Sequence, residues 1–113
     1  TINILEFTNK ALTDSAMVKA SMTITEDKTA ALQDWKVEST QDFPKYNTHI
    51  VHSLAKETNT SATGTATDGI ILTINTNGDV LTDAGSYSLF GDTLAKAVYL
   101  GVQRALENAI GTE

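Results

Sequence analysis

Cysteine is absent from the 113-residue chain, and proline occurs once, at Pro44. Without cysteine the chain forms neither disulfides nor thiolate metal sites, and this composition suits a reducing compartment. No apolar run approaches the roughly 18 residues of a membrane-spanning helix. The segment 1–7 has no basic start and only a short apolar stretch, so we expect no signal peptide. The length favours a single domain, residues 1–113.

Positive charge is also scarce, because 8 Lys and Arg stand against 14 Asp and Glu, for a formal net charge of −6. Nucleic acid and anionic membranes would not be attracted to such a molecule as a whole. A local polar face that binds one nucleic-acid structure is still compatible with this charge. We expect no membrane partner.

The usual motifs of metal sites and phosphate loops are missing. His49 and His52 lie three positions apart on a predicted strand, so their rings point to opposite faces and do not converge on a metal. The Gly- and Thr-rich segment 64–69 lacks the lysine and the spacing of a phosphate loop. No serine stands in the Gly-x-Ser-x-Gly pattern of hydrolases.

The acidic residues have structural interpretations. Glu26, Asp27 and Lys28 together predict a solvated turn, and Asp92 suits the start of a helix. We therefore expect no catalytic residues, no metal, no cofactor and no small-molecule substrate, which means that the chain is not an enzyme.

The strongest predicted element is a helix that begins in the segment 91–93 and ends before Gly111. Its apolar residues cover roughly 220° of the helix surface, whereas a helix on one sheet needs a stripe of about 100°. We expect a second copy of the chain to cover the remaining surface in a homodimer. The predicted dimer interface consists of Leu94, Val98, Leu100, Val102, Leu106 and Ile110.

Alternating patterns and threonine-rich stretches predict several strands before this helix. The predicted strands cover residues 2–7, 16–25, 34–39, 46–56 and 69–76. The polar segment 58–68 predicts an exposed, mobile loop, and 77–79 predicts a tight turn. The segment 80–90 is either a short strand or a broken helical lead-in. The expected fold is α+β, an antiparallel sheet of about five to six strands followed by a C-terminal helix, in an interlocked homodimer.

From Lys45 onward the order of parts resembles the coat proteins of single-stranded RNA bacteriophages. The similarity rests on the strand 48–54 with its His-Ile-Val core, the polar loop 58–68, the strand 69–74, Leu81-Thr82-Asp83 and the closing helix. The resemblance implies a capsid subunit that dimerises, assembles into an icosahedral shell and binds phage RNA. It also implies location in a virion that is assembled in the cytoplasm of a host bacterium.

The predicted sheet has one apolar face for the helices and one polar face. The residues predicted for the polar, RNA-binding face are Lys19, Lys36, Lys45, His49, Val51, Ser53, Thr73 and Asn75. Their short hydroxyl and amide groups and sparse lysines suit a folded RNA hairpin, although a merely solvated face would look the same. Two alternatives remain open: a small oligomeric phage or bacterial accessory module that binds another protein, and a small α+β enzyme.

Overall fold

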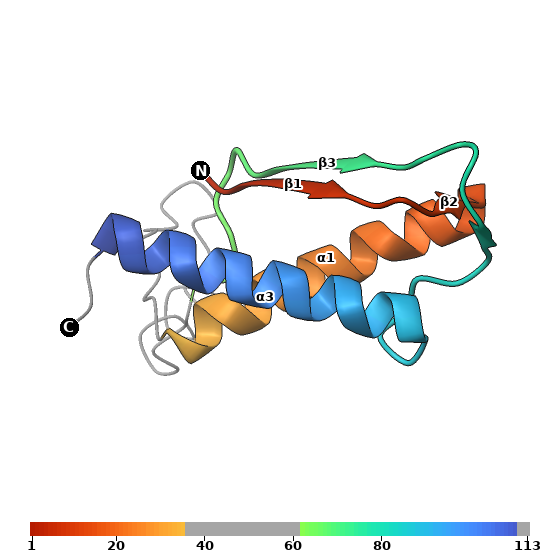
Figure 1. Cartoon of the computed structure of the whole chain (residues 1–113). Coiled ribbons are helices and arrows are strands. Elements are labelled where there is room, and N and C mark those ends of the chain that lie inside the picture. Colours follow the sequence, from red (N-terminus) through yellow and green to blue (C-terminus); the bar gives the residue numbers. More distant parts are fainter. Residues whose placement is uncertain (36–61, 111–113) are drawn as a thin grey trace, which may run out of the picture.

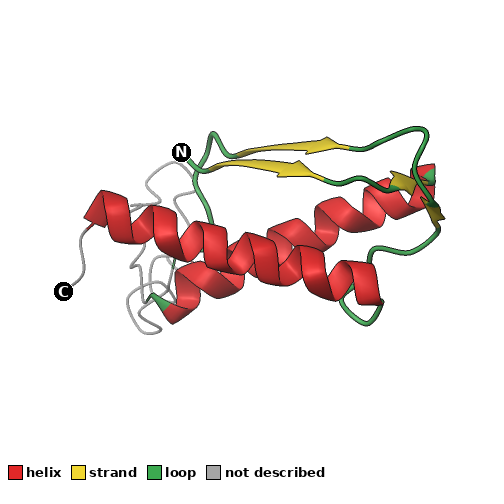
Figure 2. Cartoon of the chain, in the orientation of Figure 1, coloured by secondary structure: helices red, strands yellow, loops and turns green. Residues whose placement is uncertain are grey.

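The computed structural model describes residues 1–35 and 62–110, without the side chain of Ile110. Along the chain the elements are β1 (Asn3–Phe7), β2 (Ala11–Leu12), α1 (Asp14–Asp34), β3 (Gly69–Thr73), β4 (Val80–Leu81) and α3 (Leu89–Ile110). The strands form one layer, and α1 and α3 lie side by side in a second layer beneath it (Figure 1). Colouring by secondary structure shows the same two layers (Figure 2).

Both strand pairs are parallel. β1 pairs with β3 from Asn3–Gly69 to Phe7–Thr73, and β2 pairs with β4. Parallel partners require a long crossover, and α1 lies within the chain that connects them. The described part of the chain is therefore an α/β structure. The predicted α+β fold with an antiparallel sheet of about five to six strands is wrong.

Helix α1 occupies the segment for which we predicted a strand, 16–25. Thr13 caps its start, because the Thr13 hydroxyl accepts a hydrogen bond of 3.2 Å from the Ala16 N–H. The buried residues Ala16, Ala20 and Ile24 recur every four positions, which is the helical repeat. Met22, which the strand would have buried beside Ala20 and Ile24, is 50% exposed. The strand prediction is wrong here because several threonines favour strands locally, while packing of the alanine face decides the outcome.

A buried threonine fastens α1 to the segment before α3. The Thr23 hydroxyl donates a hydrogen bond of 2.7 Å to the Ala84 carbonyl, and Thr23 is 1% exposed. The predicted strand 34–39 is wrong at its start, since Asp34 ends α1 and Trp35 is its C-cap. The rest of that strand and all of the predicted strand 46–56 lie outside the described residues.

The strand predictions for β1 and β3 are confirmed, and so is the closing helix. Helix α3 starts at Leu89, earlier than predicted, because the Ser88 Oγ accepts from the Gly91 N–H at 3.0 Å in the manner of an N-cap. The uncertain segment 80–90 contains the short strand β4, followed by turns up to Ser88.

Helix α3 is covered on two sides, as its wide apolar arc requires, but both covers belong to the same chain. Leu94, Val98 and Val102 are buried with residues of α1, β1 and β2. The full core cluster comprises Ile4, Leu12, Ala16, Ala20, Ile24, Ala31, Ala84, Leu94, Val98 and Val102. The interlocked homodimer was inferred from a missing second cover, so this part of the fold prediction is wrong.

No helix in 1–35 or 62–110 combines the length and apolar character that crossing a membrane requires.

Candidate functional site

The residues predicted to bind RNA do not form one sheet face. Lys19 lies on α1, where its side chain adjoins Gly85, rather than on a strand. Thr73 ends β3, and the Asn75 side chain accepts a hydrogen bond of 3.0 Å from the Asn77 N–H in the following turn. The other members of the set, Lys36, Lys45, His49, Val51 and Ser53, lie outside the described residues.

Among the residues predicted for a dimer interface, Leu106 packs against the core and Leu100 is 53% exposed. The side chain of Ile110 is outside the described part of the structure. The remaining three, Leu94, Val98 and Val102, are the core residues named above.

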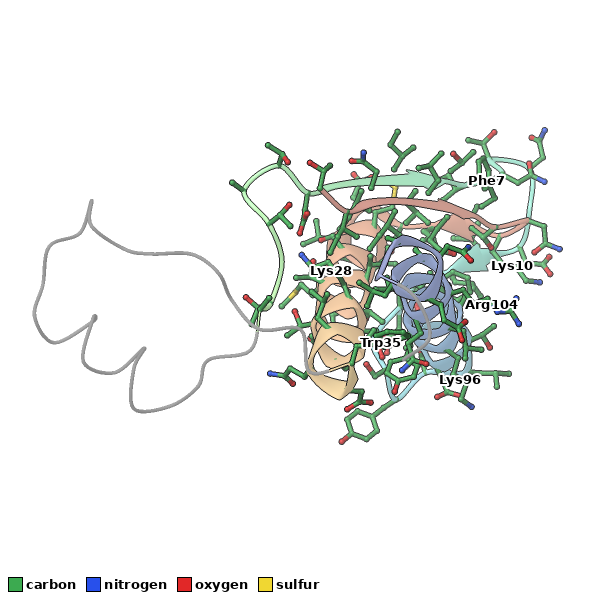
Figure 3. All side chains as sticks on the ribbon, turned by 90° about the vertical axis from the view of Figure 1, so that its left-hand side faces the viewer. Phe7, Lys10, Lys28, Trp35, Lys96 and Arg104 are labelled. Carbon is green, nitrogen blue, oxygen red and sulfur yellow. The ribbon has the colours of Figure 1, made fainter. Side chains whose placement is uncertain are left out.

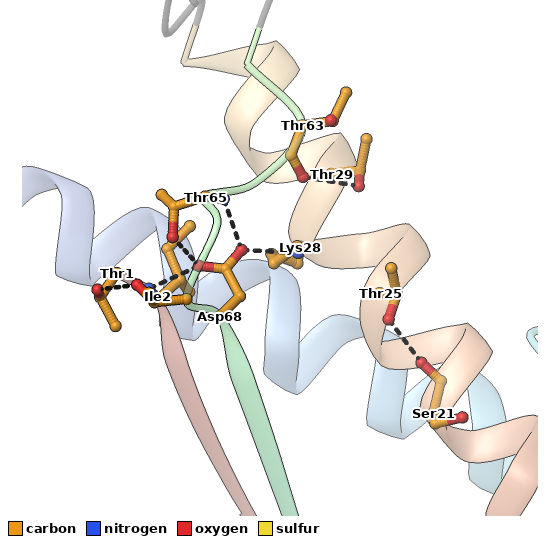
Figure 4. A network of polar contacts seen from close by, with 10 residues as sticks. Thr1, Ile2, Ser21, Thr25, Lys28, Thr29, Thr63, Thr65 and Asp68 are labelled. Atoms are coloured by element: carbon orange, nitrogen blue, oxygen red, sulfur yellow. Dashed lines mark hydrogen bonds and ion pairs between the residues drawn. The ribbon is translucent and has the colours of Figure 1, made fainter. Parts of the chain in front are cut away.

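Asp68, immediately before β3, is the centre of a polar network (Figure 4). Its carboxylate accepts hydrogen bonds from the Ile2 N–H and the Thr65 N–H, both at 2.8 Å, and from the Thr65 hydroxyl. The Lys28 ammonium lies 2.9 Å from its Oδ2. Gly64 leaves the necessary room, because a Cβ there would come within 2.7 Å of both Asp68 Oδ2 and Lys28 Nζ.

The donors of this network stabilise the ionised form of the Asp68 carboxyl group. Burial by itself raises the pKa of Asp68, but the bonds from Thr65, Lys28 and Ile2 outweigh it and hold this pKa well below its usual range. A carboxylate stabilised in this way does not accept protons near neutral pH, so it cannot serve as a general base. We interpret the network as a clamp that joins β1, the loop before β3 and α1.

The prediction of an exposed, mobile loop over 58–68 overlooked this clamp. The side chain of Asp68 is 14% exposed, and the Thr63 carbonyl accepts from the Thr29 hydroxyl at 3.2 Å. The spacing of Thr65 and Asp68 in the sequence could have indicated an ordered turn here, since Thr and Asp side chains readily form hydrogen bonds with nearby backbone groups. Residues 58–61 of the predicted loop lie outside the described range.

A groove of about 360 Å³ runs between α1 and α3. Asp27 of α1 faces a wall formed by α3, and Ser86 lies at the groove as well. The residues of α3 that line it are Asp92, Ala95, Lys96, Tyr99 and Leu100. Figure 3 shows that Lys96, at this groove, and Lys28, in the Asp68 clamp, project from different helices on different sides of the helix layer.

Asp27 is the distinctive group in this groove. Burial, together with the negative charges of Glu26 and Asp92, raises the pKa of the Asp27 carboxyl above its ordinary value. Asp92 differs, because the Lys96 ammonium lies 2.8 Å from its Oδ2. The prediction of a solvated turn at 26–28 is wrong, since these residues belong to α1.

The groove also contains a phenol. The Tyr99 hydroxyl donates a hydrogen bond to Asp34, and this bond raises the pKa of Tyr99. Within 1–35 and 62–110, no three Asp, Glu or His side chains gather closely enough to hold a metal ion. The groove therefore offers one carboxyl with a raised pKa, one paired carboxylate, a hydroxyl and partly apolar walls, a combination that suits acid–base chemistry.

Comparison with known proteins gives two matches. The model of the adenosylcobinamide amidohydrolase family, CbiZ, matches residues 1–113. The chain is 37% identical over 106 residues to an uncharacterized protein of Methanocaldococcus jannaschii, and the alignment covers 94% of this chain and 35% of the relative. The chain thus spans about a third of the length of this curated relative. No solved structure matches the chain significantly.

These matches overturn the resemblance to bacteriophage coat proteins. The predicted capsid subunit, with its homodimer, icosahedral shell and RNA partner, is wrong, and so is the alternative of a non-catalytic accessory module. The prediction that the chain is no enzyme and takes no small-molecule substrate is wrong too, because the matched family is one of amidohydrolases. Degenerate strand and loop patterns recur in unrelated folds, which is why the order of parts alone misled. The chain belongs to the CbiZ family of adenosylcobinamide amidohydrolases.

Proposed function

We propose that this chain takes part in hydrolysing an amide bond of adenosylcobinamide. The observation that carries the proposal is the family match, which extends over residues 1–113. The proposal concerns the chain as part of such an enzyme, because it spans 35% of its curated relative. Amide hydrolysis adds water to the carbonyl carbon, breaks the C–N bond and releases a carboxylic acid and an amine.

The groove between α1 and α3 supplies groups that this reaction needs. A base must take a proton from the attacking water, and an acid must give a proton to the leaving nitrogen. Asp27 fits both steps, since a raised pKa makes its carboxylate a stronger base than an ordinary aspartate. Lys96 keeps Asp92 paired, and the ionised Asp92 is one of the charges that raise the pKa of Asp27.

The size of the groove limits what enters it. A volume of about 360 Å³ lies at the low end for small-molecule sites. A corrin ring with an adenosyl group is much larger than this. On this proposal the groove takes the amide-bearing side arm, and the corrin ring stays outside the groove.

The Asp68 clamp is the other polar cluster among the described residues, and its chemistry argues against catalysis. Its carboxylate is already saturated by four donors from Ile2, Thr65 and Lys28. Its lowered pKa leaves no basicity for activating water or the Thr65 hydroxyl. The groove around Asp27 is for these reasons the better candidate.

The test is hydrolysis of adenosylcobinamide by the purified chain and by the intact Methanocaldococcus jannaschii relative, with the acid and amine products measured by liquid chromatography and mass spectrometry. We expect Asp27→Asn to lower the rate by roughly 100-fold or more, the usual contribution of general acid–base catalysis. Asp79→Asn is the matched control, because Asp79 has an 87% exposed side chain and does not line the groove.

Three results would contradict the proposal. The first is that neither the wild-type chain nor the intact Methanocaldococcus jannaschii relative releases product. The second is that Asp27→Asn keeps the wild-type rate, which would place the chemistry elsewhere. The third is an equal loss in Asp27→Asn and Asp79→Asn, which would indicate a general effect of removing negative charge.

A further inference from the structure

The outer edge of β1 is open within the described residues. Two backbone bonds fix which residues face β3: the Ile2 carbonyl accepts from the Gly69 N–H at 3.1 Å, and the Thr8 N–H donates to the Thr73 carbonyl at 2.9 Å. Backbone groups alternate between the two edges of a strand, so the even-numbered residues bond to β3. The N–H and C=O groups of Asn3, Leu5 and Phe7 consequently point toward the other edge.

A groove of about 200 Å³ lies beside β1 and over α3. Its floor contains Ala97, Gly101 and Ala105, which recur every four positions along α3. All three are exposed. Among the described residues that line this groove, Glu6 alone is charged, and burial raises its pKa. The site therefore suits an extended segment whose inward side chains are apolar.

Gly101 gives an independent indication that another chain segment approaches here. A glycine inside a helix costs roughly 0.5–1 kcal/mol relative to alanine. Apart from its chain neighbours and the nearby backbone of α3, no atom of residues 1–35 or 62–110 lies within 4 Å of the position that its Cβ would take. The absence of a side chain at Gly101 therefore leaves space that no described residue uses.

The face of the strands that points away from the helices is apolar and uncovered. Leu5 is 56%, Phe7 73% and Ile71 61% exposed, and Leu5 and Ile71 are direct partners in the β1–β3 ladder. Figure 3 shows Phe7 on the strand layer, on the side remote from the helices. Parallel sheets are normally covered on both faces, and sheets of two strands are too small to be stable alone. Both observations indicate a sheet that is larger than the part described.

We propose that the outer edge of β1 and the groove over α3 receive a further β-strand from polypeptide outside these 113 residues, of the kind that the relative carries beyond its matched part. About two-thirds of the Methanocaldococcus jannaschii protein lies beyond the 35% that the chain matches, which is ample to supply a strand and its cover. The incoming strand pairs with the backbone of Asn3, Leu5 and Phe7 and places its apolar side chains over Gly101. This inference is independent of the proposed role of Asp27.

The test is amide hydrogen exchange measured residue by residue in two proteins, this chain and the intact Methanocaldococcus jannaschii relative. In this chain we expect slow exchange at Ile4 and Glu6, which bond to β3, and fast exchange at Asn3, Leu5 and Phe7. In the intact relative, the positions aligned with Asn3, Leu5 and Phe7 should exchange at least roughly tenfold more slowly, because a neighbouring strand protects them.

Every other pattern overturns the inference. Fast exchange at these three positions in both proteins would show that no strand is added. Slow exchange at Asn3, Leu5 and Phe7 in the isolated 113-residue chain would show that a segment of this chain itself occupies the edge. Fast exchange at Ile4 and Glu6 would contradict the pairing of β1 with β3, on which the inference depends. Hydrolytic activity does not enter any of these readouts, so failure here and failure of the proposed function are distinguishable.

Discussion

The Lys28 ammonium lies 2.9 Å from the Asp68 carboxylate. This ion pair connects α1 to the residue directly before β3. The two side chains are 12% and 14% exposed. A pair removed this far from water contributes to stability only because further donors satisfy the carboxylate, as Thr65 and Ile2 do here. The clamp thereby joins α1 to the end of the β1–β3 pair at which Ile2 and Asp68 lie.

We expect Asp68→Asn to lower the free energy of unfolding by about 2–4 kcal/mol, because it leaves the Lys28 charge unpaired in a mostly buried position. Urea denaturation at pH 7, followed by circular dichroism, measures this change. The matched control is Asp79→Asn. Its partner Lys10 lies at 3.4 Å and both side chains are more exposed, so the loss should stay within about 0.5 kcal/mol. Equal losses in the two variants would contradict the role of the clamp.

The clamp also predicts how stability depends on pH. The folded-state pKa of Asp68 is lowered below that of the unfolded chain, so its contribution to stability is present above the unfolded pKa of about 3.9. This contribution is lost as the pH falls from there toward the lower folded-state pKa. Between about pH 4 and pH 2, the stability of the wild type should therefore fall more steeply than that of Asp68→Asn. Parallel curves in urea titrations at several pH values would show that Asp68 does not titrate as inferred.

The sequence correctly predicted those elements whose own residues show a strong hydrophobic pattern. β1 and β3 alternate apolar residues, and α3 carries a wide apolar arc, so each was found from local order alone. Helix α1 was missed because its buried face consists largely of alanine and includes Thr23, which gives little contrast with its exposed threonines. The parallel pairing was missed because it depends on contacts between residues more than sixty positions apart, such as Leu5 with Ile71.

The candidate site was missed for the same reason. Asp27 becomes distinctive only when α3 brings Asp92 near it, and an isolated Glu26-Asp27-Lys28 sequence resembles any solvated surface segment. Lys28 and Asp68 likewise acquire a role only through an encounter forty residues apart. The tight turn predicted at 77–79 leads into β4, and the pairing of β4 with the distant β2 could not be foreseen from the turn itself.

The Asp27→Asn variant should change catalytic activity and thermal stability in opposite directions. Because its folded-state pKa is raised above the unfolded value, ionised Asp27 opposes folding at pH 7. Asp27→Asn should therefore raise Tm at pH 7, even though it removes the proposed acid–base group. The gain should disappear near pH 3, where the wild-type carboxyl is already protonated. Differential scanning calorimetry at the two pH values measures this, and a lower Tm for the variant at pH 7 would mean that Asp27 makes stabilising contacts instead.

Two glycines of α3 should respond in opposite directions to the same substitution. At Gly101 a Cβ meets nothing within 4 Å, so Gly101→Ala should raise the free energy of unfolding by about 0.5–1 kcal/mol through helix propensity. At Gly91 a Cβ would lie 1.8 Å from the Gly85 carbonyl oxygen, so Gly91→Ala must displace the turn that precedes α3. A loss of about 2 kcal/mol or more is expected there, because backbone cannot give way as a side chain does. Urea denaturation of the two variants beside the wild type measures both changes. If Gly101→Ala were destabilising instead, another part of the chain would already occupy the groove over α3, and the strand proposed to enter it would have no room.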